Sequence, residues 1–179
     1  RVKADVIIAF FGFNESFKGP EGLPQFRTDL EKFIKETAAK NYSGRAAPRL
    51  VLVSPIANER HQDPNYPDPA ANNANIQLYA AAMAEVAKAN DVQFVDLLNP
   101  SLQAYADAAR QGSSLTINGL LLSDAGDKAL APALFRGLFN DAPPAGNFER
   151  LRAAVNDKNA QWHARYRTVD GYNVYGGRS

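Results

Sequence analysis

Three neighbouring polar residues follow the first apolar run of the chain. The run DVIIAFF covers Asp5 to Phe11, and Asn14, Glu15 and Ser16 come directly after the GF that follows it. An asparagine amide at a strand end can donate to a developing negative charge, and a serine hydroxyl is a nucleophile when a base accepts its proton. The stretch is therefore typical of a strand that delivers polar side chains to a site.

Two further apolar runs also end in polar residues. Ser54 follows RLVLV at 49–53, and Asp96 follows VQFV at 92–95. All three runs are short and rich in β-branched and aromatic residues, which indicates strands buried on both faces. Apolar residues at helical spacing lie between them, over 23–39 and about 75–90. Alternating strands and helices predict a parallel sheet, so Asn14, Ser54 and Asp96 are expected at one edge of it.

The segments after the third strand are expected to form two more helices. The first, at 101–110, would be capped by Ser101, and the second, at 123–139, would be capped by Ser123 and strained or split at Pro132. Serine is a favoured capping residue, and proline inside a helix removes a backbone hydrogen bond. The stretch at 58–75, rich in Pro, Asn and Asp, is expected to be a long polar loop.

The composition bounds the class of protein. The 179 residues suit one α/β domain, and a formal net charge of +1 does not mark a nucleic-acid binder. The chain has no cysteine, which excludes disulfides, thiolate zinc sites and cysteine nucleophiles. It contains no apolar run of about 18 residues, so we expect no transmembrane helix, and no motif predicts a cofactor.

The last part of the chain differs in character. Residues 1–141 are expected to form the α/β domain, and 142–179 a linker and a basic aromatic arm. Apolar residues recur at helical spacing among arginines and lysines between 148 and 166, and DGYNVYGGRS then shows no helix pattern. A helix of this kind packs most often on its own domain or on a partner. We therefore expect a partner contact through Phe148 to Ser179.

The order of the motifs GFNES, SPIANE, VQFVDL and LTINGLLLSDAGDKALA resembles the SGNH (GDSL-type) hydrolase superfamily. More narrowly, the chain is similar to SGNH-type domains of large secreted or periplasmic proteins from planctomycete-like bacteria, whose endings resemble NDKNAQWHARYRTVDGYNVYGGRS. The resemblance implies a three-layer α/β/α, flavodoxin-like fold with a parallel sheet, a C-terminal helical or extended arm, and a periplasmic or secreted location.

The superfamily's site consists of an early nucleophilic Ser, oxyanion donors from a Gly N–H and an Asn, and an Asp-x-x-His segment that supplies the base. By this resemblance Asn14 matches the oxyanion Asn, with Glu15, Ser16 and Ser54 as candidates for supporting positions. Asn118 stands where the Asp is expected and Leu121 where the His is expected. A leucine cannot accept a proton from serine.

The resemblance also implies strands and a nucleophilic Ser before Arg1, so the sheet would lack its first strands. We expect a protein partner or an N-terminal segment to cover the strand at Asp5 to Phe11, because a bare apolar edge favours aggregation.

The resemblance leaves two possible functions. The first, which we favour, is a non-catalytic SGNH-like domain acting as an accessory or interaction subunit. The second is an SGNH-type esterase or acetylesterase whose Ser lies upstream.

The sequence offers two other possible sites, a serine–histidine pair and a metal site, and each has a plainer explanation. Ser16 or Ser54 could pair with His61, although Ser16 is more simply a turn or cap residue and His61 a solvated loop residue. His61, Asp63 and Asp68 could bind a metal, although Asp and Pro are ordinary components of polar loops. We favour the plainer explanation in both cases and expect no metal.

Overall fold

A computed structural model of the chain describes residues 3–61 and 63–166. The chain divides into two compact units, Arg1–Pro143 and Pro144–Ser179. The first unit contains every strand of the described residues and most of the helices. The ending DGYNVYGGRS, for which we expected no helix, lies outside the described residues. No helix of the described part is long and apolar enough to cross a membrane.

The sheet of the first unit has three parallel strands in the order β1 (Val6–Phe10), β2 (Arg49–Val53) and β3 (Gln93–Val95). All three lie within the predicted runs. In the register of the sheet Ile8 pairs with Val51, and Val53 pairs with Val95. Side chains of paired residues point to the same face, which decides what each face of the sheet presents.

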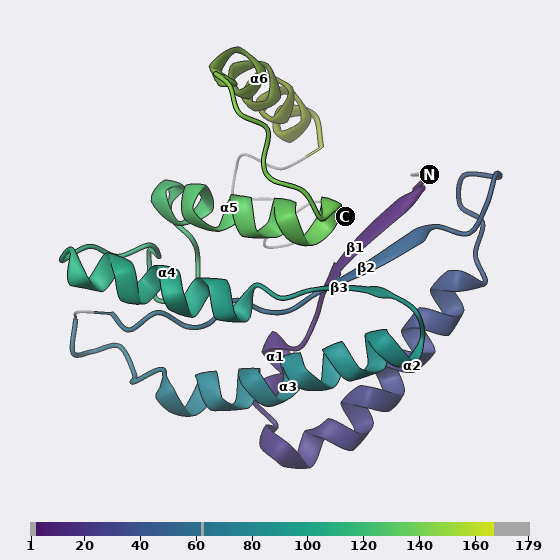
Figure 1. Cartoon of the computed structure of the whole chain (residues 1–179), viewed down its shortest axis with the longest axis horizontal. Helices are drawn as coiled ribbons and strands as arrows, with labels where there is room; N and C mark the ends of the chain where they lie inside the picture. Colours follow the sequence, from purple (N-terminus) through teal and green to yellow (C-terminus); the bar gives the residue numbers. More distant parts are fainter. Residues whose placement is uncertain (1–2, 62, 167–179) are drawn as a thin grey trace, which may run out of the picture. The chain divides into compact units, whose positions relative to one another are not determined.

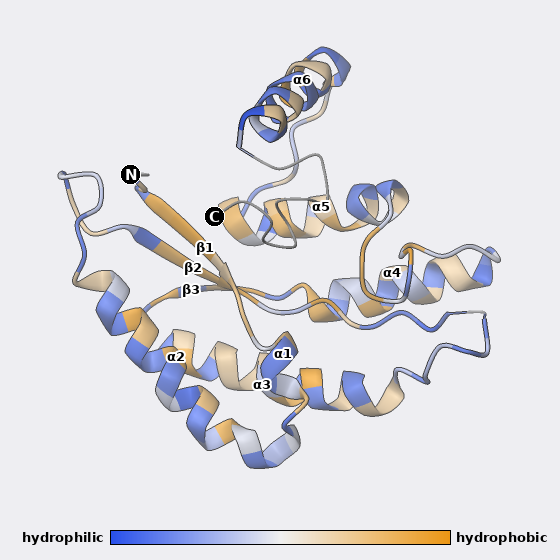
Figure 2. Cartoon of the chain, turned by 180° about the vertical axis from the view of Figure 1, so that it is seen from behind, coloured by the Kyte–Doolittle hydropathy of each residue, from blue (hydrophilic) through white to orange (hydrophobic). Residues whose placement is uncertain are grey.

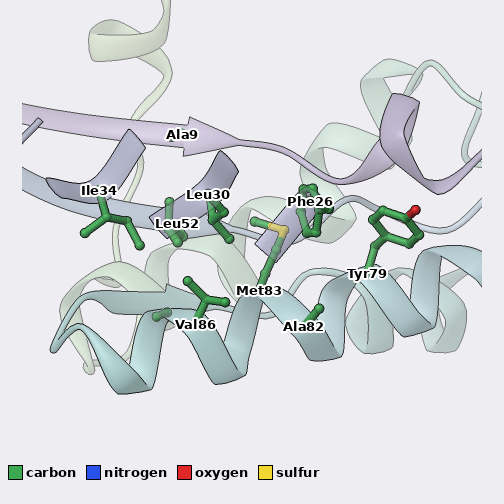
Figure 3. Close-up of a cluster of buried hydrophobic side chains, with 10 residues drawn as sticks. Ala9, Phe26, Leu30, Ile34, Leu52, Tyr79, Ala82, Met83 and Val86 are labelled. Atoms are coloured by element: carbon green, nitrogen blue, oxygen red, sulfur yellow. The ribbon is translucent and has the colours of Figure 1, made fainter. Parts of the chain in front are cut away.

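Two helices cover one face of the sheet (Figure 1). They are α2 (Leu23–Ala38) and α3 (Ala70–Ala89), which follow β1 and β2. Figure 3 shows Leu30 and Ile34 of α2 beside Met83 and Val86 of α3, with Leu52 of the sheet next to them. Burial of these apolar side chains is the main force that holds the layer to the sheet.

A second layer lies on the opposite face. It contains α5 (Asp124–Phe139), whose Leu134 and Leu138 pack on Val51 and Val53. A Cβ atom on Gly137 would lie 2.3 Å from Val95 Cγ1, so the glycine lets α5 approach β3 closely. The sheet therefore lies between two helical layers, which confirms the predicted three-layer α/β/α class.

Among the described residues, the first unit contains three further helical elements. The short α1 (Phe13–Ser16) and a 3-10 turn η1 (Gly19–Gly22) connect β1 to α2, and α4 (Leu98–Arg110) follows β3. The second unit holds α6 (Glu149–Tyr166), the predicted helix of the arm, in which no residue is buried.

Three details of the predicted elements were wrong. α3 begins at Ala70 rather than near residue 75, so the polar loop is shorter than expected. α4 begins at Leu98, and Ser101 lies inside it, where its Oγ accepts a hydrogen bond from Ala57 N at 2.8 Å. α5 runs unbroken through Pro132, since helical packing on the sheet outweighs the loss of one backbone bond. The capping role of Ser123 is confirmed, because its side chain accepts from Gly126 N.

β1 is not buried on both faces, contrary to the prediction. Ile7 and Ala9 point toward α2 and α3, whereas Val6, Ile8 and Phe10 point to the face of α5 and are 51%, 44% and 58% exposed. Figure 2 shows β1 as a hydrophobic strand at the margin of the sheet. The layer of α5 packs on β2 and β3 and does not bury these three side chains.

Candidate functional site

Asn14 lies in α1, immediately beyond the carboxyl end of β1. Gly12 makes the sharp turn between them with a φ of 95°, a conformation that favours glycine, and its N–H donates to Glu15 Oε2 at 3.0 Å. The Asn14 side chain is exposed, and none of the described residues forms a hydrogen bond with its amide. Asn14 borders a small hollow together with Phe13 and Pro55. Its amide can therefore donate to a bound molecule.

Asn118 and Leu121 form one turn. Asn118 Oδ1 accepts the N–H groups of Leu120 and Leu121 at 3.1 and 2.9 Å. Ile117 N donates to Leu121 O at 2.8 Å, which closes the turn on its other side. The Leu121 side chain is 62% exposed. The turn thus presents the side chains of Asn118 and Leu121, three residues apart, and the second of them has no polar atom.

Both residues line an open groove of about 820 Å³ at the carboxyl ends of the strands. The groove, which we call the apolar groove, is lined mostly by aliphatic and aromatic side chains, and Asp127 is the one acidic residue among them. Its lining includes Phe10, Phe13, Pro55, Ile56, Leu97, Leu120, Leu122, Leu130 and Leu134. No histidine belongs to it. It shares Phe10, Phe13 and Pro55 with the hollow beside Asn14, so the two form one continuous region.

Glu59 holds this region in place, and the sequence analysis did not single it out. Its carboxylate accepts Leu115 N at 2.9 Å, Thr116 N at 2.7 Å and Ser114 Oγ at 2.7 Å, and also bonds Thr116 Oγ1. Its backbone N–H donates to Gly119 O at 2.8 Å. The residue is 7% exposed. Its position in the motif SPIANE could have indicated this role. A carboxylate that follows an apolar strand closely tends to be buried, and a buried carboxylate needs hydrogen-bond partners.

The environment of Glu59 acts on its pKa in two directions. Burial raises the pKa, and the hydrogen bonds from Thr116, Leu115 and Ser114 lower it. The hydrogen bonds prevail, so the pKa lies below its ordinary value of 4.5. Glu59 is therefore ionised near neutral pH, and hydrogen bonds from the 114–116 segment stabilise its charge.

The two candidate serines are engaged in the framework of the fold. Ser16 is fully buried, and its Oγ donates to Phe13 O at 2.6 Å. Ser54 is also fully buried, and its Oγ accepts Leu97 N at 2.8 Å and Leu98 N at 3.1 Å. Ser54 Oγ lies 3.3 Å from Asp96 Oδ1, so these two strand ends do meet as the parallel sheet predicts.

The polar loop gives no support to the serine–histidine pair or to the metal site. The His61 ring stacks on Tyr66 with centroids 4.2 Å apart, and Arg60 binds Asp68 at 2.7 Å. Neither Ser16 nor Ser54 forms a hydrogen bond with His61. Within residues 3–61 and 63–166 no group of three or more His, Asp or Glu side chains could hold a metal ion.

Comparison with known families decides the ancestry of the chain. The profile of the GDSL-like Lipase/Acylhydrolase family matches residues 1–129. The chain belongs to this family. This confirms the resemblance to the SGNH/GDSL superfamily that the motifs indicated. None of the curated proteins compared with this GDSL-like chain matches it.

Solved structures share the fold. Axe2, an acetylxylan esterase from Geobacillus stearothermophilus, has a TM-score of 0.57 and 18% sequence identity, with 80% of this chain and 64% of Axe2 covered. LAE5, an alpha/beta hydrolase enzyme from the metagenome of Lake Arreo, Spain, has a TM-score of 0.52 and 19% identity, with 75% and 60% covered. The GDSL-like chain thus spans less than two thirds of the length of either enzyme.

The matched structures also include three catalytic mutants of Axe2. In these a serine, an aspartate or a histidine is replaced by alanine, and the aspartate and the histidine are three positions apart in Axe2.

Proposed function

We propose that this GDSL-like domain is non-catalytic and acts as an accessory or interaction subunit of a larger assembly. The observation that supports the proposal is the turn of Asn118 and Leu121. Asn118 Oδ1 accepts two backbone N–H groups, as a carboxylate at that position could, and the turn is intact. Its second side chain is a leucine, which cannot take a proton from a nucleophile at any pH. The scaffold is preserved and the proton acceptor is missing.

The lining of the apolar groove supports the same proposal. A hydrolase needs a base within hydrogen-bond reach of its nucleophile. Among the described residues no histidine lines the groove, and the two candidate serines, Ser16 and Ser54, are fully buried. Asp127, its one acid, lies in the first turn of α5. The groove is suited to apolar contact rather than to proton transfer.

The uncovered face of β1 supports an interaction role. Val6, Ile8 and Phe10 are exposed on one face of the sheet, and Phe10 also lines the apolar groove. Neighbouring large apolar side chains exposed on one face are typical of interaction surfaces in proteins. We infer that a protein partner, or an N-terminal segment, covers this face, that Phe148 to Ser179 provides a second contact, and that the assembly is periplasmic or secreted.

The test is ester hydrolysis by the chain with the sequence printed above. With p-nitrophenyl acetate we expect no turnover above that of buffer, and no change on substitution of Asn14 by Ala. A matched control is Asn65→Ala, which changes an asparagine of the polar loop. Turnover that Asn14→Ala abolishes and Asn65→Ala leaves intact would overturn the non-catalytic proposal.

A second candidate is an esterase or acetylesterase in which residues outside the described ones supply the nucleophile. The observation in its favour is the exposed amide of Asn14 just beyond the end of β1, which is free to donate a hydrogen bond to an oxyanion. Such a donor contributes roughly 3 kcal/mol to stabilising a transition state. The acetylxylan esterase activity of Axe2 names a substrate class for it, acetylated saccharides.

The sequence of the encoding gene before the codon of Arg1 distinguishes the two candidate functions. If a longer reading frame places a strand ending in Ser before Arg1, the longer protein is expressed and tested with the same ester. Activity of that protein that is lost in Asn14→Ala would establish the second candidate. An inactive longer protein that gains turnover on Leu121→His would support the first, because only the proton acceptor was missing.

A further inference from the structure

The turn of Asn118 and Leu121 contains an asparagine that is directly followed by glycine. This pair is Asn118–Gly119, and no other Asn-Gly occurs in the sequence of the chain. In such a pair the backbone nitrogen of the glycine can attack Cγ of the asparagine side chain. Glycine has no Cβ that hinders the approach, and it adopts unusual backbone angles easily. The residue types therefore mark Asn118 as the asparagine most prone to this attack.

The reaction is a deamidation, and water is its only co-reactant. Gly119 N forms a bond to Asn118 Cγ and gives up its proton to solvent. The bond from Cγ to Nδ2 breaks, and the nitrogen takes up a proton and leaves as ammonia. Water then opens the cyclic imide at one of its two carbonyl groups, which leaves an aspartate or an isoaspartate at position 118. The chain thus gains a negative charge in the apolar groove, which Asp127 also lines.

Hydrogen bonds fix both reacting groups in the folded chain. Gly119 N donates to Thr116 Oγ1 at 3.0 Å, a buried bond. Asn118 Oδ1 accepts Leu120 N and Leu121 N at 3.1 and 2.9 Å. Ring closure takes Gly119 N from its acceptor and turns the Asn118 amide away from its two donors. A buried N–H that loses its acceptor is costly, so the intact turn opposes the reaction.

Glu59 fixes the same turn from another part of the chain. Its carboxylate accepts Thr116 N at 2.7 Å and also bonds Thr116 Oγ1, so the hydroxyl that receives Gly119 N is itself held. Glu59 N donates to Gly119 O at 2.8 Å. Gly119 is buried and has a φ of 82°, a conformation that favours glycine. The glycine that makes Asn118 reactive is therefore also the residue that the turn requires.

We propose that Asn118 is a deamidation site, and that Thr116 and Glu59 keep it latent by holding Gly119. Local opening of the turn releases Gly119 N and permits the reaction. The proposal concerns a covalent change of the chain and does not depend on whether the domain hydrolyses esters.

The experiment is peptide mass spectrometry of the whole chain after incubation in weakly alkaline buffer, with and without guanidinium chloride. The mass gain on replacing an amide NH₂ by OH reports the conversion. In denaturant we expect position 118 to convert readily, and in native buffer at least about tenfold more slowly. Asn65 is an exposed asparagine followed by Tyr66 and serves as the internal control, with little conversion expected in either buffer. Equal rates at position 118 in the two buffers would overturn the proposal.

Two variants test the role of Thr116. Thr116→Val removes the acceptor of Gly119 N and keeps the shape of the side chain, whereas Thr116→Ser keeps the hydroxyl. In native buffer Thr116→Val should convert about tenfold faster than the wild type, and Thr116→Ser at nearly the wild-type rate. Equal rates in the two variants would contradict the role of Thr116. Circular dichroism verifies that each variant is folded, and the comparison of native and denatured wild type tests the proposal without any variant.

A third variant separates opening of the turn from unfolding of the domain. Ser54→Ala removes hydrogen bonds at the end of β3 and leaves every bond of Gly119 in place. It should therefore leave the conversion rate in native buffer nearly unchanged. Acceleration by Ser54→Ala equal to that by Thr116→Val would show that only global unfolding exposes the site, and would overturn the proposal. No ester is hydrolysed in this experiment, so its outcome is separate from that of the proposed non-catalytic function.

Discussion

The carboxylate of Glu59 accepts the backbone N–H of Thr116 at 2.7 Å. This bond connects the loop after β2 to the segment that carries Asn118 and Leu121. Gly119 completes the connection, because its carbonyl accepts Glu59 N and a Cβ there would lie 2.9 Å from Glu59 O. The turn of Asn118 and Leu121 is thus held by a carboxylate from another part of the chain.

Replacing Glu59 should destabilise the fold strongly. In Glu59→Gln an amide N–H₂ faces backbone donors, and at least one buried N–H loses its acceptor. We expect the free energy of unfolding to fall by about 2 to 3 kcal/mol in urea denaturation. The control is Glu36→Gln on the surface of α2, where the Lys32 contact is 3.9 Å and exposed, and the change should stay within about 0.5 kcal/mol. Equal effects of the two substitutions would contradict the role of Glu59.

The stability should also depend on pH through Glu59. Its pKa in the folded chain lies below the ordinary 4.5, so its contribution is complete above pH 4.5 and is lost as the pH falls through the folded value. Urea midpoints are measured between pH 7 and pH 3. At pH values below about 4.5 the midpoint of the wild type should decrease, and that of Glu59→Gln should decrease less. A parallel decline in both proteins would assign the acid sensitivity to other carboxyl groups.

Ser54 should prove structural rather than catalytic. Ser54→Ala removes the acceptor of Leu97 N and one of the two acceptors of Leu98 N, which keeps Asp96 Oδ1. We expect a loss of about 1 to 3 kcal/mol in the free energy of unfolding. Ser43→Ala in the exposed loop before β2 serves as the control and should be nearly neutral. An unchanged unfolding midpoint in Ser54→Ala would show that its hydroxyl carries no structural bond.

For the substitution Gly137→Ala, helix propensity and packing predict opposite changes in the free energy of unfolding. Gly to Ala inside a helix normally stabilises by about 1 kcal/mol. In Gly137→Ala the new Cβ would meet Val95 Cγ1 at 2.3 Å, so we expect destabilisation by about 1 to 3 kcal/mol instead. Adding Val95→Ala should recover part of this loss in a double-mutant cycle. Stabilisation by Gly137→Ala alone would mean that α5 lies farther from β3.

The exposed face of β1 should tolerate a charge. Ile8 is 44% exposed, whereas its neighbour Val51 on the same face is 1% exposed. Ile8→Lys should change the free energy of unfolding by less than about 1 kcal/mol and lower self-association in light scattering. Val51→Lys buries a charge beneath α5 and should unfold the domain. Unfolding by Ile8→Lys would show that this side chain is covered.

Much of the fold follows from local patterns. The three strands, the span of α2 and the cap of α5 at Ser123 come from apolar runs, helical spacing and capping preference, which act over a few residues. The position of Asn14 just beyond a strand was also predictable, because it follows an apolar run directly in the sequence. The early start of α3 could not be predicted, because the residues of its first turn do not show apolar side chains at helical spacing.

The sequence by itself determined the layer class and the family, because the periods of apolar residues and the order of short motifs are written along one dimension. Only the tertiary structure decided which face of β1 stays exposed, that Ser16 and Ser54 are buried framework residues, and that Glu59 holds the 114–116 segment. The bonds of Glu59 to Thr116 and of Ser54 to Leu97 connect residues more than 40 positions apart, and no local pattern specifies such contacts.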